Sequence, residues 1–213
     1  MKLWDKLYRL QTYTPRFPSA NAQAFLAHHV KVEDQSTKRL LDHGCGNGRH
    51  AFFFNDFGLK VTAVDSSESA LSLLKAEDIS NKIDTRLAAY ESLPFEDEYF
   101  DYVFSEGVLY YGTRDTFFLG VKEIKRCLKK GGVARIYTKT DKDYWTEFGD
   151  DLGQGVRKAK NHQFENDMLI YCASYEDIIS HMDGFSDVAI GIEEFNFVGL
   201  SHRKSFWVIT AIK

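Results

Sequence analysis

The 213-residue sequence has little of several residue types that mark specialised classes of protein. It contains only three prolines and no low-complexity linker, and its composition is that of an ordinary globular domain. Its three cysteines, Cys45, Cys127 and Cys172, are widely separated and lack the C-x-x-C spacing of a metal site. We therefore expect no metal centre and no disulfide framework, and a reducing, cytoplasmic location.

Long apolar runs and an excess of one charge are also missing. No stretch approaches the ~18 apolar residues of a membrane span, and the N-terminal MKLWDKLYRLQTYTPRF has no apolar signal-peptide core. The formal net charge is −4, with 27 basic and 31 acidic residues, which gives no electrostatic reason to expect a nucleic-acid backbone as partner. We expect neither a membrane nor a nucleic acid as the partner.

Apolar residues make up 44% of the chain, enough for one core, and we expect a single domain over residues 1–213. Aromatic residues are abundant, with 17 Phe, 11 Tyr and 3 Trp. Many of them gather in three places, at residues 4–25, 110–118 and 144–164. Most of these lie outside the predicted strands, which favours a pocket with an aromatic lid and walls.

Strands alternate with helices along most of the chain. The predicted strands cover residues 39–42, 60–65, 85–88, 100–105, 133–138, 187–197 and 205–212, and the main helices cover 49–57, 68–77, 115–128 and 174–182. This order predicts an α/β, doubly wound, mainly parallel sheet with helices on both faces. The last connection is too short for a parallel crossover, so the seventh strand should run antiparallel.

A glycine cluster follows the first predicted strand, in LLDHGCGNGRH at residues 40–50. Gly44, Gly46 and Gly48 allow a tight turn and close approach of the backbone to a ligand. The helix that follows offers unpaired N–H groups to an anionic group. Nineteen residues after Gly46 the second strand ends at Asp65, whose carboxylate can accept both hydroxyls of a ribose. Together these features predict a site for a nucleoside-containing cofactor.

The spacing of the cluster discriminates between cofactors. The dinucleotide fingerprint G-x-G-x-x-G would need a third glycine where this chain has Arg49. Asp42, beside the loop, would repel a pyrophosphate but suits a ligand that carries an ammonium group.

The motif DHGCGNGRH resembles motif I, D-x-G-x-G-x-G, of the class I S-adenosylmethionine (SAM)-dependent methyltransferases. The resemblance continues through VTAVDSSESAL, LAAYESLPFEDEYFDYVFSEGVLYY and EIKRCLKKGGVARIYT, in the order of the family's motifs, over about residues 39–138. It is closest to the small-molecule, type 11-like branch. It implies a seven-stranded Rossmann-like sheet, SAM as cofactor, and S-adenosylhomocysteine (SAH) as product.

The resemblance also implies residue roles. Asp42 and the glycine loop would hold the methionine part of SAM, Asp65 the ribose, and Ser66 the adenine. The family often has an acidic residue where this chain has Ala89-Tyr90, so the adenine contact would come from backbone or from Tyr90. The full set of implied cofactor-binding residues is Asp42, Gly44, Cys45, Gly46, Gly48, Asp65, Ser66, Ala89, Tyr90, Ser105 and Glu106.

No universal catalytic residue comes with the family, because much of the barrier to methyl transfer can be lowered by positioning alone. Topology brings His202, in the last predicted loop, toward the acceptor side, where it could act as a base or only form a polar turn. Tyr111, after the fourth strand, is a candidate for the wall of the acceptor pocket.

Two segments could cover that pocket. Residues 1–36 place Trp4, Leu7 and Tyr8 on one helical face before two prolines, as in a lid or in a helix that packs on the sheet edge. The long segment 139–172 is predicted to cap the acceptor site.

The expected function is transfer of a methyl group from SAM to an oxygen or nitrogen of a small-molecule acceptor by a monomer or homodimer. A SAM-binding regulatory module without turnover stays open, and a nicotinamide-dependent oxidoreductase is the weaker alternative.

Overall fold

The computed structural model describes residues 3–30, 36–160, 166–196 and 203–213. Seven strands form one sheet in the order β3-β2-β1-β4-β5-β10-β9. Neighbouring strands are parallel from β3 to β5, and β10 is antiparallel to both of its neighbours, so the predicted doubly wound sheet with an antiparallel seventh strand is confirmed. The strands are β1 (Arg39–His43), β2 (Lys60–Asp65), β3 (Asp84–Leu87), β4 (Phe100–Glu106), β5 (Leu128–Lys139), β9 (Asp187–Asn196) and β10 (Arg203–Ile212).

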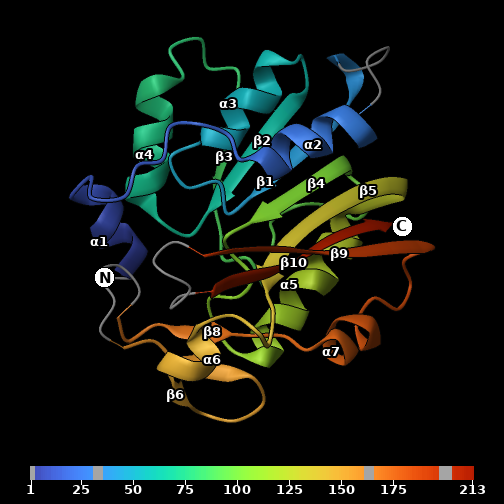
Figure 1. The fold of residues 1–213 in the computed structure, drawn as a ribbon. Helices are drawn as coiled ribbons and strands as arrows, with labels where there is room; N and C mark the ends of the chain where they lie inside the picture. The colour runs from blue at the N-terminus through green and yellow to red at the C-terminus, as the bar shows by residue number, and fades with distance from the viewer. Residues whose placement is uncertain (1–2, 31–35, 161–165, 197–202) are drawn as a thin grey trace.

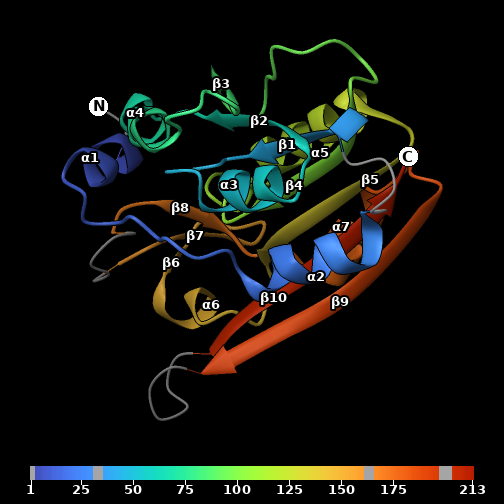
Figure 2. The same ribbon diagram turned by 90° about the horizontal axis from the view of Figure 1, so that it is seen from above.

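Helices cover both faces of this sheet, as Figures 1 and 2 show. One apolar core lies between the sheet and helices α2 (Ala20–His29), α3 (Arg49–Asp56) and α4 (Glu68–Glu77). A second core lies between the opposite face and helices α5 (Arg114–Cys127) and α7 (Tyr175–Ser180). The central strands are apolar on both faces because both faces are covered.

Helix boundaries follow the capping signals in the sequence. Ser67 and Ser174 accept backbone hydrogen bonds as the N-caps of α4 and α7. The helix predicted at 115–128 ends at Cys127, and β5 begins directly at Leu128, so the glycines at 131–132 lie in the strand and do not end the helix. Helix α7 is shorter than predicted: it ends at Ser180, and His181 is its C-cap.

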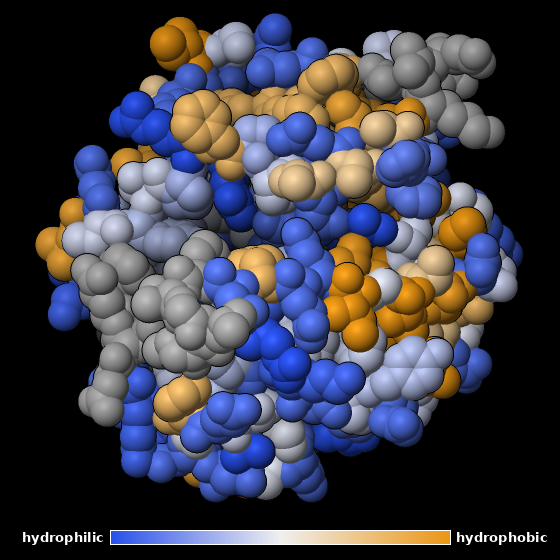
Figure 3. All heavy atoms as spheres, viewed as in Figure 1, coloured by the Kyte–Doolittle hydropathy of each residue, from blue (hydrophilic) through white to orange (hydrophobic). Residues whose placement is uncertain are grey.

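Strand β9 forms one edge of the sheet, next to β10, and none of its residues is fully buried. Apolar residues gather over β9 and β10 on the face shown in Figure 3, among mostly hydrophilic neighbours. Ile192 of β9 is half exposed. Glu193 and Glu194 place charge on this edge, which opposes pairing with the edge of another sheet.

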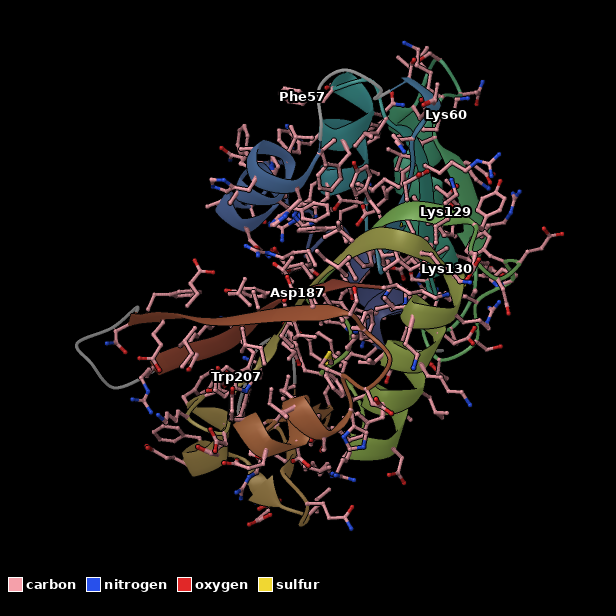
Figure 4. The ribbon with its side chains drawn as sticks, turned by 90° about the vertical axis from the view of Figure 1, so that its right-hand side faces the viewer. Phe57, Lys60, Lys129, Lys130, Asp187 and Trp207 are labelled. Atoms are coloured by element: carbon pink, nitrogen blue, oxygen red, sulfur yellow. The ribbon has the colours of Figure 1, made fainter. Side chains whose placement is uncertain are left out.

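The segment between β5 and α7 carries helix α6 (Trp145–Phe148) and a small sheet of β6 (Asp150–Asp151), β7 (Val156–Lys158) and β8 (Leu169–Tyr171). Trp207 of β10, labelled in Figure 4, lies on the side of the sheet that faces α7, and its indole N–H donates to the Ala173 carbonyl at 2.8 Å. Lys60 and Lys129, also labelled there, mark the edge at which β2 and β5 begin. The opposite edge, where the parallel strands end, carries the site described below.

A buried ion pair joins this segment to the sheet. Lys139, at the end of β5, places its Nζ 3.0 Å from Asp143 Oδ2, and the two side chains are 2% and 0% exposed. The same carboxylate accepts the backbone N–H groups of Ser205 and Trp145. No described helix is long and apolar enough to cross a bilayer.

Lys139→Met should lower the free energy of unfolding by about 3–5 kcal/mol, because it leaves the Asp143 carboxylate buried without its cation. The double variant Lys139→Met/Asp143→Asn should recover part of this loss, since no charge stays buried. Urea denaturation measures both values. Lys38→Met is the matched control: Lys38 pairs with Asp101, its side chain is 37% exposed, and its loss should cost less than ~1 kcal/mol. Equal losses for Lys139→Met and Lys38→Met would show that burial of the pair has no energetic consequence.

Candidate functional site

A cavity of about 360 Å³ opens where β1, β2 and β4 end. This is the edge at which doubly wound sheets bind ligands. Its walls come from four parts of the chain: the N-terminal segment, the glycine loop after β1, the turns after β2 and β3, and the segment after β4. The residues that line it are Trp4, Tyr8, Tyr13, Pro15, His43, Gly44, Cys45, Gly46, Asn47, Arg49, His50, Val64, Asp65, Ser66, Ala88, Ala89, Tyr90, Glu91, Glu106, Gly107, Val108, Tyr110 and Tyr111.

The glycine loop needs glycine for two different reasons. Gly46 has a φ of +56°, and a Cβ there would lie 2.3 Å from the hydroxyl oxygen of Tyr8. Gly48 has a φ of +92°, and a Cβ there would lie 2.7 Å from the Leu74 side chain. The absence of a side chain at Gly46 therefore leaves room for the Tyr8 side chain at the cavity wall. The absence of a side chain at Gly48 lets α3 pack against α4, and Gly48 does not line the cavity.

Asp65 fixes the shape of two loops at once. Its Oδ2 accepts the Gly46 N–H at 2.9 Å, and its Oδ1 accepts the Ser67 N–H at 2.9 Å. The carboxylate therefore joins the glycine loop to the first turn of α4. Asp65 also lines the cavity, and a carboxylate oxygen can accept more than one hydrogen bond.

Glu106, at the end of β4, is surrounded by hydrogen-bond donors. Its Oε2 accepts from Ser19 Oγ at 2.8 Å and from Asn21 Nδ2 at 3.0 Å, and its Oε1 accepts from Arg49 at 3.1 Å. These bonds tie the start of α2 and the start of α3 to the sheet. Glu106 and Arg49 both line the cavity, so the cavity wall carries a negative and a positive group side by side.

Asp42 lies behind the glycine loop and does not line the cavity. It is 1% exposed, and in the described structure its Oδ2 has no hydrogen-bond partner. Burial, together with the Glu106 and Asp65 carboxylates, raises the pKa of Asp42 to about 7, against a smaller opposing effect of Arg49. A cationic ligand in the cavity would stabilise the charged form of this group.

His43, between Asp42 and the glycine loop, holds the neighbouring walls together. Burial lowers its pKa to about 4, so the ring is neutral at pH 7. Its Nε2 faces the Tyr90 carbonyl at 3.4 Å and must donate, so its Nδ1 accepts from the Ser105 hydroxyl at 2.9 Å. Ser105 is thereby turned toward His43 and, contrary to expectation, does not line the cavity.

The remaining wall is aromatic. The Tyr90 hydroxyl donates to the Tyr111 carbonyl at 2.9 Å, and the Tyr111 ring lies 4.4 Å from that of Tyr110 and 5.0 Å from that of Trp4 between centroids. Strand β8 supports this wall from outside, because Tyr171 N–H donates to the Tyr110 carbonyl. The described part of segment 139–172 therefore holds the aromatic wall in place and does not itself line the cavity.

The predicted site residues divide into three groups. Those that line the cavity are Gly44, Cys45, Gly46, Asp65, Ser66, Ala89, Tyr90, Glu106 and Tyr111; those behind its wall are Asp42, Gly48 and Ser105; and His202 lies outside the described residues. Sequence reasoning did not assign ligand contacts to Tyr8, Tyr13, Asn47 or Arg49. For Tyr8, the helical spacing with Trp4 and Leu7 was the available signal. No group of three metal-ligating side chains occurs among residues 3–30, 36–160, 166–196 and 203–213.

Residues 41–136 match the family model described as a methyltransferase domain. The tRNA U34 carboxymethyltransferase of Nautilia profundicola is 37% identical over 52% of this chain and 36% of its own length. The cypemycin N-terminal methyltransferase of a Streptomyces species is 28% identical over 55% of this chain and 44% of its own length. The chain thus spans less than half the length of these two curated relatives.

Solved structures share the fold. A SAM-dependent methyltransferase from Methanosarcina mazei has a TM-score of 0.71 at 18% identity, over 92% of this chain and 98% of its own. The 1,6-didemethyltoxoflavin-N1-methyltransferase of Burkholderia thailandensis, solved with its substrate and SAH, has a TM-score of 0.63 at 20% identity, over 91% of this chain and 76% of its own.

The raised pKa of Asp42 predicts a pH dependence of stability in the ligand-free protein. The carboxyl has a pKa of 3.8 when unperturbed and about 7 in the fold, so the folded chain binds the extra proton between these values. Stability should therefore fall as the pH rises from about 4 to about 7, by up to ~4 kcal/mol, and Asp42→Asn should remove this component.

Urea denaturation across this pH range measures the effect. Asp84→Asn is the control, because this carboxylate is about half exposed at the far end of β3. Identical pH profiles for the wild-type protein and Asp42→Asn would contradict the assignment.

Proposed function

We propose that this chain is a SAM-dependent methyltransferase that transfers the methyl group of SAM to an oxygen or nitrogen of a small-molecule acceptor. The match of residues 41–136 to a methyltransferase domain and the fold shared with SAM-dependent methyltransferases support this proposal. The observation that carries the proposal is the charge of the cavity. Asp65 and Glu106 line it, Asp42 lies directly behind its wall, and Arg49 is the cation among them. An excess of negative charge suits a ligand with an ammonium and a sulfonium group.

The residues present fit SAM part by part. Asp65 lines the cavity at the end of β2, where a carboxylate can accept ribose hydroxyls. The unpartnered Asp42 Oδ2 gives the loop a negative charge toward an amino group, and Arg49 offers a donor to a carboxylate. Ala89 and Tyr90, after β3, lie at the adenine side.

When bound, SAM supplies a methyl group on a positively charged sulfur, which a nucleophile attacks in line. The chain would contribute orientation and exclusion of water. Tyr110, Tyr111, Trp4 and Tyr13 form an aromatic wall, which favours an acceptor with a flat or apolar part. Tyr111 and His202 stay candidates for contacting the acceptor.

The three buried free thiols support the expected reducing, cytoplasmic location.

Binding measurements separate this proposal from the oxidoreductase alternative. In calorimetry, SAM and SAH should bind and NAD should not, because Arg49 replaces the third glycine of a pyrophosphate-binding loop. Asp65→Ala should weaken SAM binding at least ~10-fold, since it removes the ribose contact and the two bonds that shape the loops. The control is Asp84→Ala, which removes a carboxylate outside the cavity. Binding of NAD without SAM, or unchanged affinity in Asp65→Ala, would sink the cofactor assignment.

The acceptor class needs a turnover experiment, because curated relatives act on tRNA as well as on a peptide N-terminus. We expect transfer from labelled SAM to flat small molecules that carry a hydroxyl or amine, and none to tRNA, given the net charge of −4. Transfer to tRNA alone would replace the small-molecule assignment. SAM binding without transfer to any acceptor tested would favour the regulatory module.

A further inference from the structure

A single carboxylate holds helix α1 (Leu3–Arg9) on the first turn of α4. Asp5 Oδ1 accepts from Ser67 Oγ at 3.0 Å and from the Ser69 N–H at 2.9 Å. The bond from Ser69 helps to hold the pKa of Asp5 below its ordinary value, so the group is charged at neutral pH. A negative charge at this place also interacts favourably with the dipole of α4. Figures 1 and 2 both show α1 beside α4.

The turn that Asp5 binds is the turn that closes the cofactor cavity. Ser67 follows directly after Asp65 and Ser66, which line the cavity. Asp65 accepts the Ser67 backbone N–H, whereas Asp5 accepts its side-chain hydroxyl. Asp65 and Asp5 therefore bind the same residue, Ser67, from two different elements. A displacement of this turn would change the hydrogen bonds of both carboxylates.

Tyr8 lies one helical turn after Asp5 and points into the cavity. Its side chain lines the cavity wall beside Gly46, where a Cβ would lie 2.3 Å from the phenol oxygen. Burial and the nearby Asp65 carboxylate raise the pKa of Tyr8, so the hydroxyl stays a neutral donor. The residue is only 6% exposed, and its side chain faces the cavity. A phenol hydroxyl in a cavity wall can donate to a ligand oxygen.

The other end of α1 reaches the aromatic wall. The Trp4 ring packs edge-on against Tyr111 at 5.0 Å and against Tyr13 at 5.5 Å. Helix α1 thus bridges the nucleoside side of the cavity, at Asp65, and the acceptor side, at Tyr111.

We propose that Asp5 is a positioning residue that couples cofactor binding to the docking of α1, and that the docked helix adds the Tyr8 hydroxyl to the cofactor site. This inference rests on the proposed function, because it takes SAM or SAH as the ligand between α1 and the glycine loop. A ligand held between the two surfaces stabilises the docked helix, and by linkage the docked helix raises the affinity for the ligand. Such changes in affinity appear mostly in the rate of release.

Hydrogen–deuterium exchange with SAH as the probe tests the coupling. In the wild-type protein, SAH should slow amide exchange at residues 44–48 and also at residues 3–9. In Asp5→Ala, SAH should still slow exchange at 44–48 but no longer at 3–9, and stopped-flow release of SAH should be at least ~10-fold faster. Asp5→Asn, which keeps an acceptor without the charge, should be intermediate.

Two variants serve as references. Glu68→Ala removes an exposed acid from the first turn of the same helix α4 but keeps the Ser67 hydroxyl and the Ser69 N–H that bind Asp5, and should behave as the wild-type protein. Tyr8→Phe keeps the ring and the docking contacts, so α1 should exchange normally without ligand while SAM affinity falls several-fold.

The outcomes separate the coupling from the proposed function. Protection by SAH at 44–48 with no change at 3–9, or wild-type release of SAH by Asp5→Ala, would overturn the coupling and leave the cofactor assignment intact. Unchanged SAM affinity in Tyr8→Phe would remove the hydroxyl from the site. If SAH protects neither segment, the cofactor assignment fails, and the coupling fails with it.

Discussion

The parallel alignment of β1 with β2 and β4 is the constraint on which the site depends. In this register His43 lies opposite Val64 on one side and opposite Ser105 on the other. The glycine loop, Asp65 and Glu106 therefore all emerge at the same edge of the sheet, within reach of one ligand. A slip of one residue in either pairing would turn these side chains to the wrong faces. The apolar cores on both faces resist such a slip, because nearly every residue of β1 and β2 is buried.

The charges of three carboxylates near the cavity are compensated to different degrees, because their hydrogen-bond partners differ. Glu106 is satisfied by side chains from α2 and α3, and Asp65 by backbone N–H groups of two loops. Asp42 has the least compensation, and its pKa rises accordingly. Glu106 and Asp65 are well compensated in the ligand-free protein, whereas Asp42 is compensated only in part, by Arg49. Ionisation of Asp42 therefore lowers the stability of the ligand-free protein, and a cationic ligand would offset this loss.

The sequence predicted what depends on local order and on strand or helix periodicity. The order of strands and helices in the sheet, and the placement of Gly46 and Asp65 at one edge of that sheet, follow from such signals. It did not separate Ser105 from Glu106, because successive residues of a strand face opposite sides and only the neighbouring strand decides which side faces the cavity. The sequence also placed Gly48 among the cofactor-binding residues. In the structure its lack of a side chain instead leaves room for Leu74 against α3.

The N-terminal segment shows the same division most clearly. The spacing of Trp4, Leu7 and Tyr8 by itself determined a helix with one apolar face. It left open whether this helix forms a lid over the pocket or packs on the edge of the sheet. Only the tertiary structure decided that α1 docks on α4 with Tyr8 turned into the cavity. The deciding contact joins Asp5 to Ser69, which are 64 positions apart in the chain. Local patterns record which residues share a face, but the partner of that face depends on packing between elements distant in sequence.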